Sequence, residues 1–449
     1  MAASTPVNSS SRPGQGSEDV APLTWGIELE FLIPWEMSSP EEDAENDPVP
    51  DPRWWLSTAA QEEGEALYDV LGMDHLYFSQ MLVQDLEGLG IPATTEMEMA
   101  RPGGLDEARR RMGWQFDGNV DPEFQFWVVK PEAVDVTYDN DPEKFEHYNW
   151  YGMEITSPIF RDEGEFRVQL SQVLGVLRNG YRVHVNSACG VHVHLSEDRV
   201  GGLSLATLKR TIALYLLSED RIFGLVHPDR PDGEHSWKIT KGSTLVEGLG
   251  EQEPGAPEDP GLADWIPSDL SDPVLRGMMS RLWKARDRDE LQTLLLSQAS
   301  MGYSRRGAIS VQQKGPEDIR ARITLEGRQL QGTLDPHLVA NWVSVLGQLV
   351  KIQATPQARY RTIVTAMWTD HGKTPEAPLG GETAGRESED LLARLELPED
   401  IRRWWRSYLE TQRLSLQGLD LDPDYYISRL RDVPRPWFIG HGYAPRPEQ

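Results

Sequence analysis

Hydrophobic and polar residues alternate in several short stretches of this chain, most clearly at 24–33 (TWGIELEFLI) and 190–196 (GVHVHLS). Successive side chains of a β-strand point to opposite faces, so each stretch predicts a strand with one apolar and one polar face. Further strands are predicted at 123–129, 151–157, 181–186, 306–313 and 321–329. The strands at 181–186 and 190–196 are separated by Ser-Ala-Cys, and this short spacing predicts a hairpin.

A second pattern, with apolar residues at helical spacing, predicts helices at 59–90, 165–180 and 203–226. The helix at 165–180 ends at Asn179-Gly180, which is a stop signal. Asp335-Pro336 predicts the start of another helix, because it places a capping residue before a proline at the first helical position. Strands outnumber tight β-α-β units, which favours an α+β fold with a largely antiparallel sheet.

Changes in composition along the chain divide it into three predicted parts. Residues 1–21 are rich in Ser, Gly and Pro and predict a disordered tail. Residues 22–354 carry the alternating strands and predict the main domain, which contains one long Gly-, Pro- and Asp-rich loop at 229–275. Residues 355–449 predict a helical C-terminal extension that ends in a Pro-rich tail.

The overall charge narrows the choice of partners. The 449 residues include 72 acidic and 44 basic side chains, for a net charge of −28. Nucleic acid and anionic membranes both require a basic surface, so neither is expected as a partner. Cys189 is the single cysteine and excludes an intrachain disulfide. The sequence shows neither a signal-peptide pattern nor an apolar run of about 20 residues, so a soluble cytoplasmic protein is expected.

The polar faces of the predicted strands carry an unusual set of side chains. Glu28 and Glu30 share one face of their strand, as do His192 and His194, and Glu326 and Arg328. Glu154 alternates with apolar neighbours in the same way. If these strands form one sheet, a single face collects four carboxylates, two imidazoles and a guanidinium. The alternative is an ordinary solvated sheet face with a surface ion pair, which needs no function.

The absence of lysine from these polar faces favours a metal site, because converging carboxylates repel one another unless cations neutralise them. Carboxylate oxygens with a few imidazole nitrogens suit Mg²⁺ or Mn²⁺. Such ions commonly bind the phosphates of a nucleotide, and a neighbouring arginine fits phosphoryl transfer. The sequence contains no Walker A motif and no dinucleotide-binding glycine motif, so an ATP site would have another design.

Five segments occur in an order and spacing that resemble a known family. They are WGIELEFL, YGMEITSPI, ACGVHVHLS, HPDR and ITLEGRQLQGTLD, spread over roughly residues 22 to 350. Together they resemble the fungal-type amidoligases, part of the glutamine synthetase and glutamate–cysteine ligase superfamily of carboxylate–amine ligases. The resemblance implies a curved, largely antiparallel sheet with helices on its convex side, as in the glutamine synthetase catalytic domain. It also implies that ATP and Mg²⁺ or Mn²⁺ bind on the concave face.

The chemistry implied by the resemblance is the ATP-dependent joining of a small-molecule or peptide carboxylate to an amine. The γ-phosphoryl group of ATP activates the carboxylate, and the amine then attacks the acyl phosphate. The resemblance implies metal ligation by Glu28, Glu30, Glu154, His192 and Glu326. It implies phosphate contacts for His194 and Arg230, and stabilisation of the transferred phosphoryl group by Arg328.

Two alternatives remain open. A zinc-dependent hydrolase would use His192 and His194 as ligands, with His184 joining them across the predicted hairpin. A non-catalytic relative would keep the sheet and bind a nucleotide or a protein. Departures from the family pattern favour the second alternative: Ser310 stands for the usual Asn, Gly327 for an aromatic residue and Leu330 for a His. A preference for Zn²⁺ over Mg²⁺ or Mn²⁺ would distinguish the hydrolase from the ligase. Binding of ATP without turnover would identify the non-catalytic protein.

Overall fold

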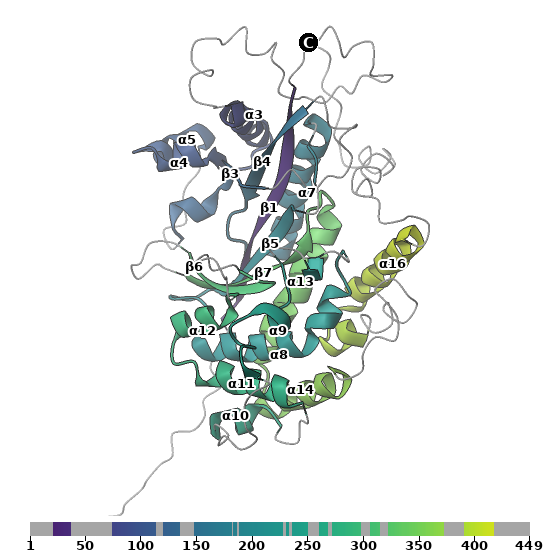
Figure 1. Ribbon diagram of the computed structural model, residues 1–449. Coiled ribbons are helices and arrows are strands. Elements are labelled where there is room, and N and C mark those ends of the chain that lie inside the picture. The colour runs from purple at the N-terminus through teal and green to yellow at the C-terminus, as the bar shows by residue number, and fades with distance from the viewer. Residues whose placement is uncertain are drawn as a thin grey trace, which may run out of the picture.

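A seven-stranded sheet organises the described part of the chain, in the strand order β2-β3-β4-β1-β5-β7-β6 (Figure 1). The computed structural model describes residues 21–36, 74–113, 120–134, 148–181, 183–185, 188–227, 230–232, 236–249, 260–267, 272–297, 306–314, 322–371 and 390–416. The strands are β1 (Leu23–Glu36), β2 (Ala93–Thr95), β3 (Trp127–Pro131), β4 (Tyr148–Thr156), β5 (Gly190–Glu197), β6 (Ile309–Lys314) and β7 (Arg322–Gln331). β2 and β3 are parallel and all other neighbours are antiparallel, so the fold is α+β with a mixed sheet.

The predicted hairpin of 181–186 with 190–196 is wrong. His184 pairs with Leu32 of β1, and Val191 of β5 pairs with Leu29, in both cases antiparallel to β1. The two segments therefore run in the same direction, one after the other along β1, whereas the strands of a hairpin run in opposite directions. The strand predicted at 123–129 also begins late, because Pro122–Gln125 forms the 3₁₀-helix η1.

Helices are present at most of the positions where the sequence predicts them. They are α3 (Asp74–Gly88), α4 (Glu96–Ala100), α5 (Gly104–Met112), α7 (Glu163–Gly180), α8 (Leu205–Phe223), α9 (Ile239–Gly242), α10 (Pro260–Trp265), α11 (Pro273–Lys284), α12 (Arg288–Leu295), α13 (Pro336–Gln353), α14 (Gln357–His371) and α16 (Glu399–Leu416). The Asp335 side chain caps α13 as predicted, by accepting hydrogen bonds from the first free backbone amides. The predicted loop 229–275 is not continuous loop, since it contains η2 (Arg230–Asp232), α9 and α10.

One face of the sheet is apolar and packs on helices. Ile27, Leu29 and Phe31 of β1 are fully or almost fully buried, and α7 and α13 lie on this side of the sheet (Figure 1). A Cβ atom at Gly327 would lie 2.5 Å from Leu346 Cδ1 of α13. This contact leaves no room for the aromatic side chain of the family pattern, so the helix is packed directly against the backbone of β7.

The C-terminal helices share the same hydrophobic core. Trp405 of α16 lies edge-on to Trp342 of α13, with ring centroids 6.3 Å apart, and Tyr360 of α14 is fully buried. Part of the predicted helix 59–90, the predicted tail 1–21 up to residue 20, and the Pro-rich tail lie outside the described residues. Where the chain is described, none of its helices has both the length and the apolar character needed to cross a membrane.

Candidate functional site

The polar face of the sheet brings together the side chains that the sequence singled out. Glu28 lies opposite His192, and Glu30 lies opposite Glu154 on the other neighbouring strand. His194 lies opposite Glu326 of β7. Strand pairing thus gathers residues that are up to 298 positions apart, counting from Glu28 to Glu326, on one side of the sheet. This face is opposite the apolar one that packs on α7 and α13.

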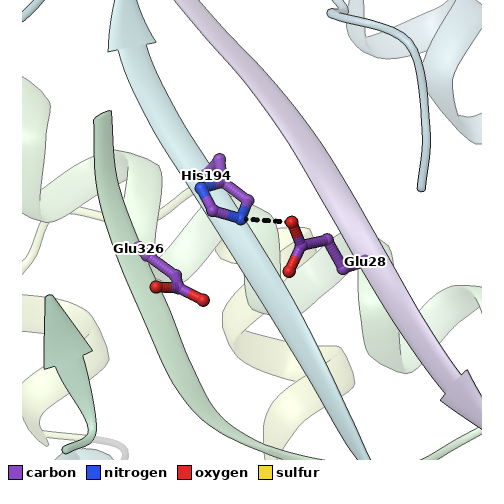
Figure 2. A group of neighbouring side chains, drawn as sticks. All are labelled: Glu28, His194 and Glu326. Carbon is purple, nitrogen blue, oxygen red and sulfur yellow. Dashed lines mark ion pairs between the residues drawn. The ribbon is translucent and has the colours of Figure 1, made fainter. Parts of the chain in front are cut away.

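Three of these side chains converge closely enough to share a metal ion. One ligand atom each from Glu28, His194 and Glu326 lies within 4.8 Å of the others (Figure 2). His194 Nε2 is 3.0 Å from Glu28 Oε1, yet it is buried without a hydrogen-bond partner because the approach lacks hydrogen-bond geometry. A buried imidazole nitrogen that makes no hydrogen bond and that belongs to a close group with two carboxylates suits a divalent cation. The family resemblance implied metal ligation by His192 and a phosphate contact for His194, whereas the converging group contains His194.

His192 occupies a different position, between charged side chains of both signs. Its Nδ1 is 3.2 Å from Glu28 Oε2, its Nε2 is 3.5 Å from Glu30 Oε1, and Arg328 Nη1 is 3.4 Å from Nδ1. Burial lowers the pKa of His192 and Arg328 acts in the same direction, but Glu30, Glu28 and Glu326 outweigh both and raise it. The imidazole therefore serves as a positive or strongly polarised group among the carboxylates.

The carboxylates respond to this setting in different ways. Burial alone would raise the pKa of Glu28, but His194, His192 and Lys314 hold it well below its usual value. Glu326 is lowered to a pKa of about 2, because His194, Arg328 and His192 overcome the effect of burial. Glu154 is raised to a pKa of about 7 by burial and by the neighbouring charge of Glu28. The centre of the face thus stabilises anions more strongly than the position of Glu154 does.

Glycine at position 190 allows the cluster to close. Its backbone N–H donates a 2.6 Å hydrogen bond to Glu30 Oε2. A Cβ atom at Gly190 would lie 3.0 Å from His192 Nε2 and 3.2 Å from Glu30 Oε2. Any side chain here would push against the polar cluster, which is a physical reason for glycine before the His-x-His sequence.

Arg328 is fixed at the cluster by a short ion pair and by the shape of β7. Its Nη1 donates to Glu326 Oε1 at 2.7 Å, while Ser310 Oγ donates to Glu326 Oε2 at 2.6 Å. The pairing of β5 and β7 shifts register around His192, so two residues of β7 face one residue of β5. Such a bulge redirects side chains next to it. The bulge therefore helps to direct Arg328 towards the carboxylates.

Arg230 lies beside the same bulge and binds backbone. It is 3% exposed, and its guanidinium donates to the carbonyl oxygens of Arg328 at 2.9 Å, Gln329 at 3.2 Å and Cys189 at 3.3 Å. These bonds connect the start of β5 to the bulge of β7. The phosphate contact expected for Arg230 stays a prediction, and the contacts present here are those of a residue that positions the site.

Two lysines lie on this face that were not predicted from the sequence, and the expectation of a polar face without lysine is wrong. Lys130 Nζ of β3 is 2.9 Å from Glu154 Oε1, and Lys314 Nζ of β6 is 2.9 Å from Glu28 Oε1. The polar faces of the four strands that were considered carry no lysine, but the flanking strands supply these cations. The sequence contains a pattern that predicts the position of Lys314. Lys314 follows Ser310 by four residues, so the two side chains share one face of a strand.

Two cavities lie away from this cluster. A cavity of about 360 Å³ is bordered by α3, β2, α4 and, on β3, by Val129 and Pro131, whose side chains alternate with Lys130. Another of about 220 Å³ lies between Leu23, Glu197 and the end of α13. The chemistry of charged groups, rather than cavity size, therefore identifies the polar face as the candidate site.

Comparison with known proteins agrees with the sequence motifs at the general level of an amidoligase. Residues 97–241 match the model of a family described as "putative amidoligase enzyme". The matched segment includes Glu154, His192, His194 and Arg230, whereas β1 and β7 lie outside it. No curated protein matches the chain. The match supports an amidoligase family and, at the general level, a ligase.

Proposed function

We propose that this chain is an ATP-dependent carboxylate–amine ligase that forms an amide or isopeptide bond through an acyl phosphate. The observation that carries the proposal is the convergence of Glu28, His194 and Glu326, with Arg328 paired to Glu326 at 2.7 Å. The family match over residues 97–241 supports the ligase class. An unactivated carboxylate cannot lose its oxygen to an amine, and phosphorylation turns that oxygen into a leaving group.

The residues of the polar face supply the parts that such a reaction needs. Glu28, His194 and Glu326 would hold Mg²⁺ or Mn²⁺, with Glu30, Glu154 and His192 as further ligands around them. When bound, the metal would neutralise phosphate charge and polarise the phosphoryl group. Arg328 would bind the transferred phosphoryl group, because its guanidinium offers donors in a planar fork that fits phosphate oxygens. Glu326 keeps that guanidinium in one orientation.

A second candidate function rests on the two lysines. Lys314 and Lys130 pair with Glu28 and Glu154, so the carboxylates already have cations from the chain itself. A non-catalytic protein that binds a nucleotide or another protein would keep such pairs. The zinc hydrolase has less support, because the converging group contains one histidine and two carboxylates.

The test of the proposed function is calorimetric titration of the protein with a non-hydrolysable ATP analogue, with and without Mg²⁺ or Mn²⁺. We expect binding that requires the metal and that Glu28→Ala weakens at least about tenfold, since the variant removes the central carboxylate. Glu247→Ala provides a matched control, because Glu247 is exposed and distant in sequence from the cluster. It should bind as the wild type does.

The outcomes separate the candidates. Metal-dependent binding that Glu28→Ala removes, followed by phosphate release with a carboxylate and an amine, supports the ligase. Binding of the analogue without phosphate release in a broad screen of carboxylate–amine pairs supports the non-catalytic protein. Tight binding of Zn²⁺ with no effect of any nucleotide would contradict the ligase and favour the hydrolase.

A further inference from the structure

Lys314 contacts a carboxylate oxygen of Glu28, which also belongs to the candidate metal group of Glu28, His194 and Glu326. Its Nζ lies 2.9 Å from Glu28 Oε1, and His194 Nε2 lies 3.0 Å from the same atom. The Lys314 side chain is 36% exposed, whereas that of Glu28 is 9% exposed. The ammonium group thus reaches the centre of the face from a partly solvated position.

The position of Lys314 requires a strongly curved sheet. β6 is the third strand from β1, and the strand registers place Lys314 roughly six residues further along the sheet than Glu28. At about 4.8 Å per strand and about 3.3 Å per residue, a flat sheet would separate the two Cα atoms by roughly 24 Å. That distance exceeds the combined reach of the two side chains. The end of β6 therefore bends over the polar face, in agreement with the crossing of β6 and β1 in Figure 1.

Arg230 and Arg328 also lie near the cluster, and their guanidinium groups are held more firmly than the Lys314 ammonium group. Arg230 is 3% exposed and bonds three backbone carbonyls. Arg328 is 12% exposed at its side chain and pairs with the fully buried Glu326. Lys314 differs from both, because its flexible stem and its exposure let the ammonium group leave Glu28 while His192 and His194 still lie beside that carboxylate.

We propose that Lys314 is a further phosphate-binding residue of the nucleotide site, held by Glu28 until a divalent cation takes that carboxylate. The proposal rests on the proposed function. A cation between Glu28, His194 and Glu326 competes with the ammonium group for Glu28 Oε1. The displaced ammonium then bonds an oxygen of the nucleotide's phosphates, which arrive at the same face with the metal. Lys314 thus couples loading of the metal to capture of the nucleotide.

The test uses Lys314→Met in the full chain and measures Mn²⁺ alone and a non-hydrolysable ATP analogue at saturating Mn²⁺, both by calorimetry. Loss of the competing cation should tighten Mn²⁺ binding about fivefold, the size of a partly exposed ion pair. Loss of the phosphate ligand should weaken binding of the analogue about tenfold. Lys314→Arg keeps a cation and should bind the analogue within about threefold of the wild type.

Lys351→Met is the charge-matched control, because Lys351 is exposed on α13 and its loss changes the net charge equally. It should leave both affinities unchanged. Wild-type binding of both Mn²⁺ and the analogue, with Lys314→Met unchanged in either affinity, would overturn the role of Lys314 and leave the proposed function standing. Failure of the wild type to bind Mn²⁺ or the analogue would overturn the proposed function itself.

Discussion

Two buried carboxylates, one on the polar face of the sheet and one on a helix, have their pKa values shifted in opposite directions. Glu326 on the polar face is 0% exposed and Glu219 of α8 is 1% exposed. Yet Glu326 has its pKa lowered to about 2, whereas that of Glu219 is raised to about 7. Burial raises both, so the neighbours must account for the difference.

The neighbours differ in charge. Glu219 accepts hydrogen bonds from Ile239 N at 2.6 Å and from Thr240 N at 3.0 Å, which are dipoles and carry no net charge. His194, Arg328 and His192 lower the pKa of Glu326, and together they outweigh the cost of desolvation. The comparison teaches that hydrogen bonds suffice to hold a buried carboxylate in place, while full cations are needed to keep it ionised. Glu219 anchors the start of α9, and Glu326 stays ionised among its charged neighbours.

The largest expected effect comes from removing the ionised partner. Glu326→Ala leaves Arg328 buried without its carboxylate, so the free energy of unfolding should fall by about 3–5 kcal/mol. Glu219→Ala leaves only dipolar donors without an acceptor and should cost less, about 1–3 kcal/mol. Urea denaturation of both variants measures the difference. Equal losses, or a larger loss in Glu219→Ala, would contradict the distinction between the two carboxylates.

The pH dependence of stability should differ as well. In the range from the ordinary value of 4.5 to about 7, unfolded Glu219 is ionised while the folded side chain keeps its proton. Folding then takes up a proton, so the contribution of Glu219 to stability is fully present below pH 4.5 and is lost as the pH rises to 7. The loss amounts to at most about 3 kcal/mol. Glu326 acts in the opposite sense, with stability lost as the pH falls from 4.5 towards 2.

Glu219→Gln isolates this contribution. Because the amide does not ionise, the variant should lose less stability than the wild type between pH 5 and pH 8. Chemical denaturation at both pH values gives the two slopes, and Glu247→Gln, at an exposed position, should keep the slope of the wild type. Identical slopes for Glu219→Gln and the wild type would show that Glu219 is ionised when folded.

The sequence predicted the strands of the polar face because alternation is a local property. Glu28, Glu30, His192 and His194 each belong to a clear period of two, and pairing then placed them on one side of the sheet. The false hairpin at 181–186 arose because spacing alone does not give strand direction. Both segments pair with β1 instead of with each other. This arrangement is possible because β1 is long enough to pair with each in turn.

Other features of the site could not be predicted from local sequence patterns, because they depend on contacts between distant segments. The contact between Lys314 and Glu28 depends on the curvature of the whole sheet, which accumulates over several strands. The backbone contacts of Arg230 depend on a bulge that cannot be predicted from the sequence of β7. Glu219 occupies the apolar stripe of α8, near Tyr215 and Ile222, so its burial was readable, but its partners in α9 lie in a segment predicted as loop.

The smallest expected effect concerns a neutral partner of the ionised carboxylate. Ser310 Oγ donates to Glu326 Oε2 at 2.6 Å and accepts from Gln312 Nε2 at 2.8 Å. Ser310→Ala removes one of several groups that stabilise Glu326 and should lower the free energy of unfolding by about 1 kcal/mol. Ser310→Asn restores the amide usual in the resembled family and should retain more Mn²⁺ affinity than Ser310→Ala. A loss in Ser310→Ala as large as that in Glu326→Ala would mean that the hydroxyl, and not the cations, keeps Glu326 ionised.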